Sequence, residues 1–236
     1  MRLNKIALAS LVLGGSALLA ACGGGGGSSG SALTVNGTAA IGKPLVGAVS
    51  ATCKTGSGTA NSNLDGSYTV VVTNGFGPCL LAITPTGGPT LYSITNGSGA
   101  TQTANITPMT NLLVNYLRNV PGMNGAADPT AWFALPAVKA LLADPAALAT
   151  RIVNDFIPAL KTLLPTLSVA NTDFVFTAFT ASPTASATDA DLEKLKTGNI
   201  VTSTGAPSAA ATSSLATAAS NDTPVVTPTG ATGAGT

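Results

Sequence analysis

The pattern of apolar and polar residues divides the chain into two regions of different character. Between residues 32 and 107, short runs rich in β-branched and aromatic residues alternate with turn residues, and no helical period competes with them. The runs predict six or seven short strands, at about 33–36, 45–54, 68–72, 78–83, 90–95 and 100–106. Strands at this spacing predict an antiparallel β-sandwich over residues 32–107 rather than a barrel or a βαβ unit.

From residue 108 to residue 196 the apolar residues recur every three or four positions, which predicts a helical region. Three start signals pair an N-cap with a proline at the first helical position: Thr107-Pro108, Asp128-Pro129 and Asp144-Pro145. Pro158 is expected to kink or end the third of these helices near Phe156. Thr188 is expected to cap a last short helix, with Asp191 at the reciprocal position.

Residues 197–236 consist mostly of Ala, Thr, Ser, Gly and Pro, with few large apolar side chains. A segment of this composition cannot bury enough surface to fold alone, so we predict a disordered tail. The expected fold class is therefore a mainly β N-terminal sandwich followed by a small α-helical region, with disordered termini.

The N-terminus has the layout of an export signal. Arg2 and Lys5 precede an apolar stretch from 6 to 19, and small residues lead to Cys22, which predicts a signal peptide over residues 1–21. The apolar stretch is shorter than the roughly 20 residues that span a bilayer, so a transmembrane anchor is the weaker interpretation. Leu19-Ala20-Ala21-Cys22 resembles the lipobox of bacterial lipoproteins. The alternative is an ordinary signal peptide with a chance cysteine near its end.

The lipobox resemblance implies a lipid on Cys22, such as palmitate, and cleavage that makes this cysteine the first residue. Residues 22–31 then form a lipidated cysteine and a Gly/Ser tether. Lipoproteins carry two or three acyl chains, whereas one chain alone binds a membrane only marginally. Lipoproteins of the inner membrane of enteric bacteria typically have Asp after the cysteine, and Gly23 stands there in this chain. The resemblance thus implies a lipid anchor in the outer membrane.

The two other cysteines, Cys53 and Cys79, form an even pair in a compartment that permits disulfides. We predict that they are bonded, because the bond would close a loop of about 26 residues and contribute about 3 to 4 kcal/mol by chain entropy. A redox-active pair is the alternative. It would favour a Cys-x-x-Cys motif, which the sequence lacks.

A second resemblance covers the predicted sandwich, from Leu33 to about Asn105. The runs GKPLVGA at 42–48 and DGSYTV at 65–70 resemble the carboxypeptidase regulatory-like domain, which is a transthyretin-like sandwich. In that family the domain usually serves as a structural or interaction module without catalytic residues, so the resemblance implies the same role. A cysteine pair is not a general feature of the family, and this chain departs from its pattern there.

The composition of the chain limits the classes of function and partner that we expect. Charged residues make up 8% of the chain, against roughly 25% in ordinary soluble domains. The net charge is +1, and removal of a signal with Arg2 and Lys5 would leave a nearly neutral protein, which excludes nucleic acid as an expected partner. The absence of histidine from the sequence removes Ser-His-Asp and Cys-His arrangements and the usual zinc sites, and we expect no cofactor.

Candidate chemistry outside the cysteines is sparse. Asp189, Asp191 and Glu193 cluster at the predicted start of a helix, where capping is the favoured role and calcium binding the alternative. Trp132 and Phe133 could stack on a sugar, although aromatic residues at a helix start are more often core.

We therefore expect a non-enzymatic, membrane-anchored envelope lipoprotein that acts as a structural or interaction module toward another envelope protein. The alternative is a carbohydrate-binding or adhesive surface module, which exposed aromatic side chains would favour. A third class, an enzyme that uses carboxylates, would need two acidic side chains that converge in a pocket.

Overall fold

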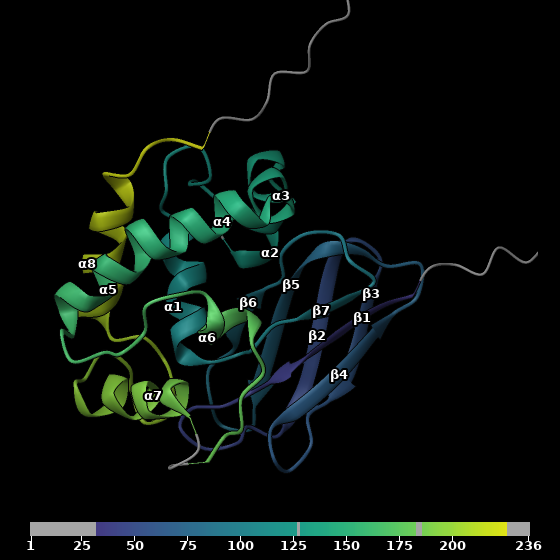
Figure 1. Cartoon of the computed structure of the whole chain (residues 1–236), viewed down its shortest axis with the longest axis horizontal. Helices are drawn as coiled ribbons and strands as arrows, with labels where there is room; N and C mark the ends of the chain where they lie inside the picture. Colours follow the sequence, from purple (N-terminus) through teal and green to yellow (C-terminus); the bar gives the residue numbers. More distant parts are fainter. Residues whose placement is uncertain (1–31, 127, 183–185, 226–236) are drawn as a thin grey trace, which may run out of the picture.

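The computed structural model describes residues 32–126, 128–182 and 186–225. Two β-sheets occupy one side of the molecule and helices occupy the other (Figure 1). The predicted order, a β-sandwich followed by a helical region, is therefore confirmed. The expected signal peptide, Cys22 and the Gly/Ser tether lie outside the described residues.

Two sheets with the orders β4-β1-β7 and β3-β2-β5-β6 form the sandwich. The strands are β1 (Leu33–Thr38), β2 (Gly47–Thr55), β3 (Ser57–Asn61), β4 (Ser67–Val72), β5 (Phe76–Pro85), β6 (Leu91–Ile94) and β7 (Thr101–Thr103). Strands β1 and β7 pair in parallel, so the prediction of a wholly antiparallel sandwich is wrong at this edge. The reason is that the chain leaves β6 in one sheet and enters β7 in the other sheet at the end where β1 also begins. At that end the Thr34 N–H donates to Ala100 O.

Strand β5 shows how the two regions join. Its apolar run is buried on both faces, as the lack of alternation in its sequence indicates. Leu81 and Ile83 belong to the core between the two sheets. Leu80 and Ile94, on β5 and β6, instead belong to the core that the helices form. The helical region thus covers the outer face of the four-stranded sheet.

Most helix starts are as the sequence predicts. The helices are α1 (Pro108–Leu117), α2 (Pro129–Ala134), α3 (Pro136–Ala143), α4 (Pro145–Arg151), the π turn η1 (Ile152–Phe156), α5 (Ile157–Leu163), α6 (Asp173–Phe176), α7 (Ala187–Thr197) and α8 (Ala209–Ser220). The side chains of Thr107, Asp128 and Asp144 accept backbone N–H groups of the first turns. Helix α7 is capped by Ser186, so the assignment of its cap to Thr188 is wrong. Within the described residues, no helix has the length and apolar character needed to cross a membrane.

The helix before Pro158 does not end at Phe156, but its geometry changes there. Helix α4 passes into η1, and α5 follows directly. A proline has no backbone N–H, and its ring crowds the carbonyl group four residues earlier, here that of Asn154. The wider π turn accommodates Pro158 without ending the helix.

The largest correction concerns residues 197–225, which composition predicts to be disordered. Val201 forms a bridge with Pro207, and α8 follows. Ala211, Leu215 and Ala219 lie one turn apart on one face of α8 and are buried in the helical core. The small alanine side chains allow α8 to pack closely on α1. The composition argument fails because this segment does not fold alone but packs on a surface that the preceding helices provide.

A polar clasp, defined as Tyr116, Arg151, Asp155 and Asp222, holds the segment after α8. Arg151 Nη1 lies 3.2 Å from Asp155 Oδ2 and 3.2 Å from Asp222 Oδ2. The Tyr116 hydroxyl donates to Asp222 Oδ2 at 2.5 Å. Burial, together with the bond to Asp222, raises the pKa of Tyr116. Arg151 Nη2 also donates to Thr223 O, so the clasp fixes the backbone as well as the side chain.

Candidate functional site

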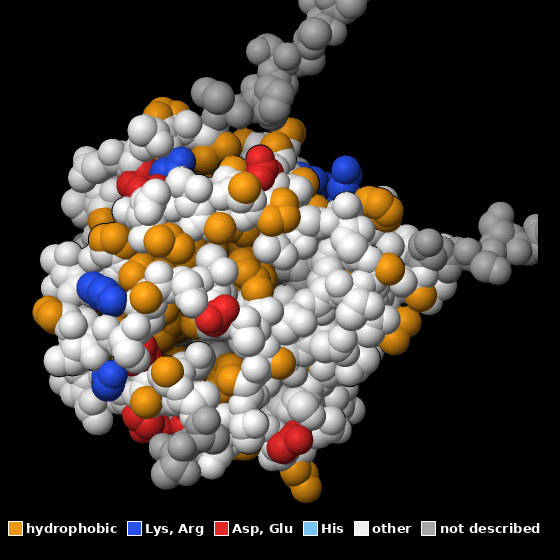
Figure 2. Space-filling model, viewed as in Figure 1, with side chains coloured by type: hydrophobic (Ala, Val, Ile, Leu, Met, Phe, Trp, Pro, Cys, Tyr) orange, Lys and Arg blue, Asp and Glu red, His pale blue; other side chains and the backbone are white. Residues whose placement is uncertain are grey.

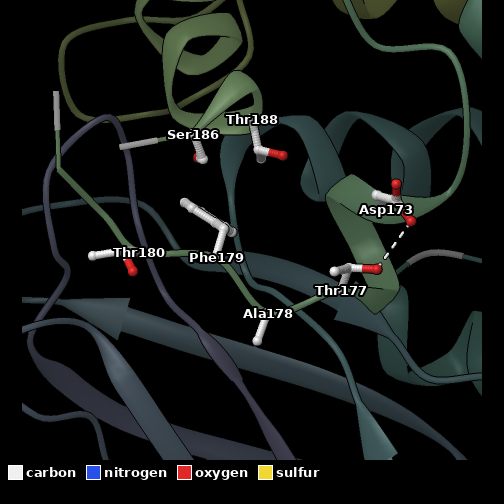
Figure 3. Close-up of a pocket in the computed structure, with 7 residues that line it drawn as sticks. All are labelled: Asp173, Thr177, Ala178, Phe179, Thr180, Ser186 and Thr188. Carbon is white, nitrogen blue, oxygen red and sulfur yellow. Dashed lines mark hydrogen bonds between the residues drawn. The ribbon is translucent and has the colours of Figure 1, made fainter. Parts of the chain in front are cut away.

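A crevice with a volume of about 460 Å³ lies where the segment after α6 passes between the sandwich and α7 (Figure 3). Its lining comes from α6, from the segment that follows α6, and from the start of α7. The lining residues are Asp173, Thr177, Ala178, Phe179, Thr180, Ser186 and Thr188. Hydroxyl groups therefore predominate, with one carboxylate and one aromatic ring.

The crevice wall is fixed by Asn105, a fully buried side chain between the sandwich and α6. Asn105 Oδ1 accepts the Thr38 N–H at 3.1 Å, while Nδ2 donates to Phe174 O at 3.2 Å and to Thr177 O at 2.7 Å. The Thr38 hydroxyl donates to Phe179 O at 2.6 Å. These bonds hold the backbone from 174 to 179 against the end of β1, so this wall of the crevice is fixed to the sandwich.

The side chains in the crevice present hydrogen-bonding groups and one ring. Asp173 accepts the Thr177 hydroxyl at 2.9 Å (Figure 3). Phe179 is half-buried, and its ring projects into the space between Thr180 and α7. Hydroxyl groups donate and accept hydrogen bonds, so the wall suits an uncharged ligand rich in hydroxyl groups. Phe179 lies outside any periodic run, so no pattern in the sequence indicated its place in the crevice.

A smaller cavity of about 220 Å³ adjoins the crevice and contains two carboxylates, those of Asp173 and Asp191. Asp191 accepts the backbone N–H groups of Ser168 and Val169 at 3.0 and 2.8 Å, and Lys194 Nζ lies 2.8 Å away. Burial raises the pKa of Asp191, but the bonds from Lys194, Ser168 and Val169 outweigh burial and lower it overall. A general acid needs the opposite shift, so Asp191 serves to fix the loop at 168–169 rather than to donate a proton.

The acidic cluster on α7 does not gather into one site. Asp191 pairs with Lys194, and Glu193 pairs with Lys196 at 2.6 Å. Asp189 is fully buried, and neither carboxylate oxygen has a hydrogen-bond partner. Burial and the charge of Glu193 raise the pKa of Asp189, against an opposing effect of Lys196. In the part of the chain that the structure describes, no three acidic, Cys or His side chains are grouped to hold a metal ion.

The aromatic residues that the sequence suggested for sugar stacking belong to the core. Trp132 is fully buried, and only 3% of Phe133 is exposed. Tyr68 is buried as well, and its hydroxyl donates to Ala104 O. Burial raises the pKa of Tyr68. A stacking platform made of Trp132 and Phe133 is thus not formed, and Phe179 is the aromatic ring that a ligand in the crevice would meet.

Cys53 and Cys79 form the predicted disulfide, with an S–S distance of 2.00 Å. The two residues face each other in the register of β2 and β5, and both are buried between the sheets. The bond therefore links neighbouring strands in the sandwich core. It lies away from the crevice, whose lining contains neither cysteine.

Comparison of the chain with family models, curated proteins and solved structures gave no match. The two resemblances, to the lipobox and to the carboxypeptidase regulatory-like domain, therefore rest on the residues that carry them. The sandwich has the general fold class that the second resemblance implies. Membership of that family stays a prediction, as does the lipid on Cys22, which lies outside the described residues.

Proposed function

We propose that the protein is an exported lipoprotein, anchored in the outer membrane through Cys22, whose folded part is a non-enzymatic interaction module. The observation that carries the proposal is the buried Cys53–Cys79 disulfide. Structural disulfides persist in oxidising compartments outside the cytosol, which supports export. The bond also uses two of the three cysteines, so Cys22 is the one left for acylation.

Acylation is tested by labelling cells that express the full chain with a palmitate analogue. Wild-type protein should be labelled and should sediment with membranes, whereas Cys22→Ala should be unlabelled. The double variant Cys53→Ala/Cys79→Ala is the matched control, because it removes the other two thiols and should keep the label. Label that persists on Cys22→Ala would overturn the proposed anchor.

An interaction role, rather than catalysis, is supported by the groups in the crevice. Its hydroxyl groups can bind a ligand, and the two neighbouring carboxylates are engaged in hydrogen bonds with the chain itself. The described surface is also poor in charge, which favours contacts through hydroxyl and amide groups over ion pairs. We expect the partner to be a component of the cell envelope.

The partner is sought by photo-crosslinking from the crevice. A photoreactive residue in place of Thr180 should capture an envelope component in living cells. The same residue in place of the exposed Val153, on the helical region, is the control. Equal products from both positions would show random contact and contradict an interaction role for the crevice.

A second candidate function is glycan binding, and the observation that favours it is the half-buried Phe179 ring among hydroxyl groups. Sugar rings stack on aromatic faces and exchange hydrogen bonds with hydroxyl-rich walls. Titration of the full chain with soluble cell-wall oligosaccharides, followed by NMR, should shift resonances of residues 177–180. The variant Phe179→Ala should lose these shifts and Val153→Ala should keep them. Shifts that survive in Phe179→Ala would exclude this candidate.

A further inference from the structure

One end of the sandwich lies where the chain enters from its N-terminal side. Leu33 pairs with Val72 there, and the turn after Val72 is closed by a bond from Gly75 N–H to Val72 O. The start of β5 pairs with the end of β2, with Phe76 opposite Thr55. We call this the tether end and define it as residues 32–34, 54–56, 71–76 and 96–100. The far end is marked by the pairing of Thr38 with Ser67.

The tether end exposes apolar side chains. Phe76 and Val71 are 48% and 54% exposed, although both types are usually buried. Apolar side chains are visible in Figure 2 along the margin next to the grey N-terminal trace. Lys54 is exposed and is the only charged residue within the ranges that define this end. The residues that define this end thus include an exposed aromatic ring, an exposed aliphatic side chain and one cation.

Chain length limits how far this end can be from the membrane. Ten residues, 22–31, connect the acylated cysteine of the proposed lipoprotein to Ala32. Even a fully extended chain of this length spans at most about 35 Å. The proposed anchor therefore keeps the tether end within about 35 Å of the lipid, at high effective concentration.

We propose that the tether end docks on the bilayer itself, with Phe76 and Val71 inserted at the boundary between headgroups and acyl chains. This proposal rests on the proposed lipid anchor and adds an orientation to it. Apolar and aromatic side chains bind at this boundary, and Lys54 would face anionic headgroups. Among the residues that define this end, Lys54 is the one charged residue, and the sign of its charge suits a lipid surface.

Docking would turn the crevice away from the membrane. A neighbouring cavity is lined by Thr38 and Ser67, which mark the far end, together with Phe179 of the crevice. Leu64, which is 87% exposed, lies in the turn between β3 and β4 at the same far end. The docked molecule would thus present the crevice and Leu64 toward the compartment, as an interaction module requires.

The test uses the full acylated chain in vesicles of phosphatidylethanolamine and phosphatidylglycerol that contain brominated lipid, which quenches nearby tryptophan. The variant Phe76→Trp reports on the tether end, and Leu64→Trp is the matched control at the far end. The native Trp132 is fully buried and gives a common background. Intact mass reports acylation of each variant separately. For the wild-type chain, hydrogen exchange of residues 73–76 is compared between vesicles and detergent.

We expect loss of emission from Phe76→Trp but not from Leu64→Trp, and slower exchange at residues 73–76 in vesicles. Acylated Phe76→Trp without quenching would overturn docking and leave the anchor intact. A blue shift without quenching would assign the patch to contact between protein copies and would overturn docking too. Equal quenching at both ends would exclude a fixed orientation. Absence of a lipid on Cys22 would overturn both proposals.

Discussion

The sandwich and the helical region are stabilised by different kinds of contact. The sandwich is held by hydrogen bonds between paired strands, and the buried Cys53–Cys79 disulfide links β2 to β5. The helical region packs large side chains, with Phe156 between Tyr116 and Phe174, and closes on its C-terminal segment through the polar clasp. In both regions a local pattern indicates the elements, and distant contacts join them. In the sandwich these contacts are backbone pairings such as β1 with β7, whereas the helical region uses side chains about a hundred positions apart, such as Tyr116 and Asp222.

The largest effect is expected in the sandwich. The double variant Cys53→Ala/Cys79→Ala should lose about 3.5 kcal/mol of unfolding free energy, because the unfolded chain is no longer constrained by the loop. Urea unfolding measures the loss. The shared sheet β3-β2-β5-β6 should make both regions unfold together, so fluorescence of Trp132 and circular dichroism should give one transition. Two separate transitions would show that the regions are independent.

The next largest effect concerns the segment that composition failed to predict. Leu215 is 1% exposed on α8, and Leu215→Ala should cost about 3 kcal/mol through lost burial and the cavity left behind. Ser214→Ala, at an exposed position on the same helix, is the control and should change stability little. An unchanged urea midpoint for Leu215→Ala would mean that α8 does not pack on the helical core.

The polar clasp gives a smaller effect. Asp222→Asn removes the charge beside Arg151 and should lower the free energy of unfolding by about 1.5 kcal/mol, which is the lower end of the range for a hydrogen bond to a charged group. Glu193→Gln breaks a more exposed pair with Lys196 and should cost less than about 0.5 kcal/mol. Thermal unfolding of both variants compares them directly. Equal losses would show that burial adds nothing to the clasp.

The smallest effect depends on pH. The pKa of Asp189 is raised in the folded state, so the protonated carboxyl favours folding. This stabilisation is fully present below the pKa of the unfolded chain, about 3.9, and it is lost as pH rises through the higher pKa of the folded state. Asp189→Asn replaces the buried carboxylate with a neutral amide, so the variant should be more stable than wild type at pH 7 by about 1 kcal/mol.

The advantage of Asp189→Asn should shrink as pH falls through the raised pKa of the folded state, because the wild-type carboxyl then becomes protonated. Urea unfolding across this pH range tests the sign. Asp128→Asn, at an exposed helix cap, is the control, because Asn caps a helix as well as Asp. A variant at position 189 that is less stable than wild type at pH 7 would contradict the unpaired buried carboxylate.

Much of the fold could be predicted because it is encoded locally. Alternation and turn residues indicate the strands, and proline after an N-cap marks three helix starts. The cap of α7 was misassigned because Ser186 and Thr188 are both good caps, and the choice depends on which backbone N–H each can reach. The parallel pairing of β1 with β7 depends on where the chain crosses between sheets, which no local pattern indicates.

The candidate site was less predictable than the fold. The disulfide could be predicted from the pair of cysteines that is left when Cys22 is assigned to a lipid, whereas the crevice required Asn105 to bring α6 to the end of β1. Asn105 and Phe174 are 69 residues apart in the sequence, and neither belongs to a motif. Trp132 was a candidate because of its residue type, but it lies in the core. Phe179 lines the crevice because of its place in the fold, which no local pattern indicates.

The central claim is that the three cysteines have two separate uses, one as a lipid anchor and two as a bond between strands. Its most direct test is intact and peptide mass spectrometry of the protein purified from membranes without reductant. We predict a mature chain that begins at Cys22, carries a diacylglyceryl group there, and contains Cys53 linked to Cys79. A chain that begins elsewhere, or an unmodified Cys22 thiol, would contradict the account.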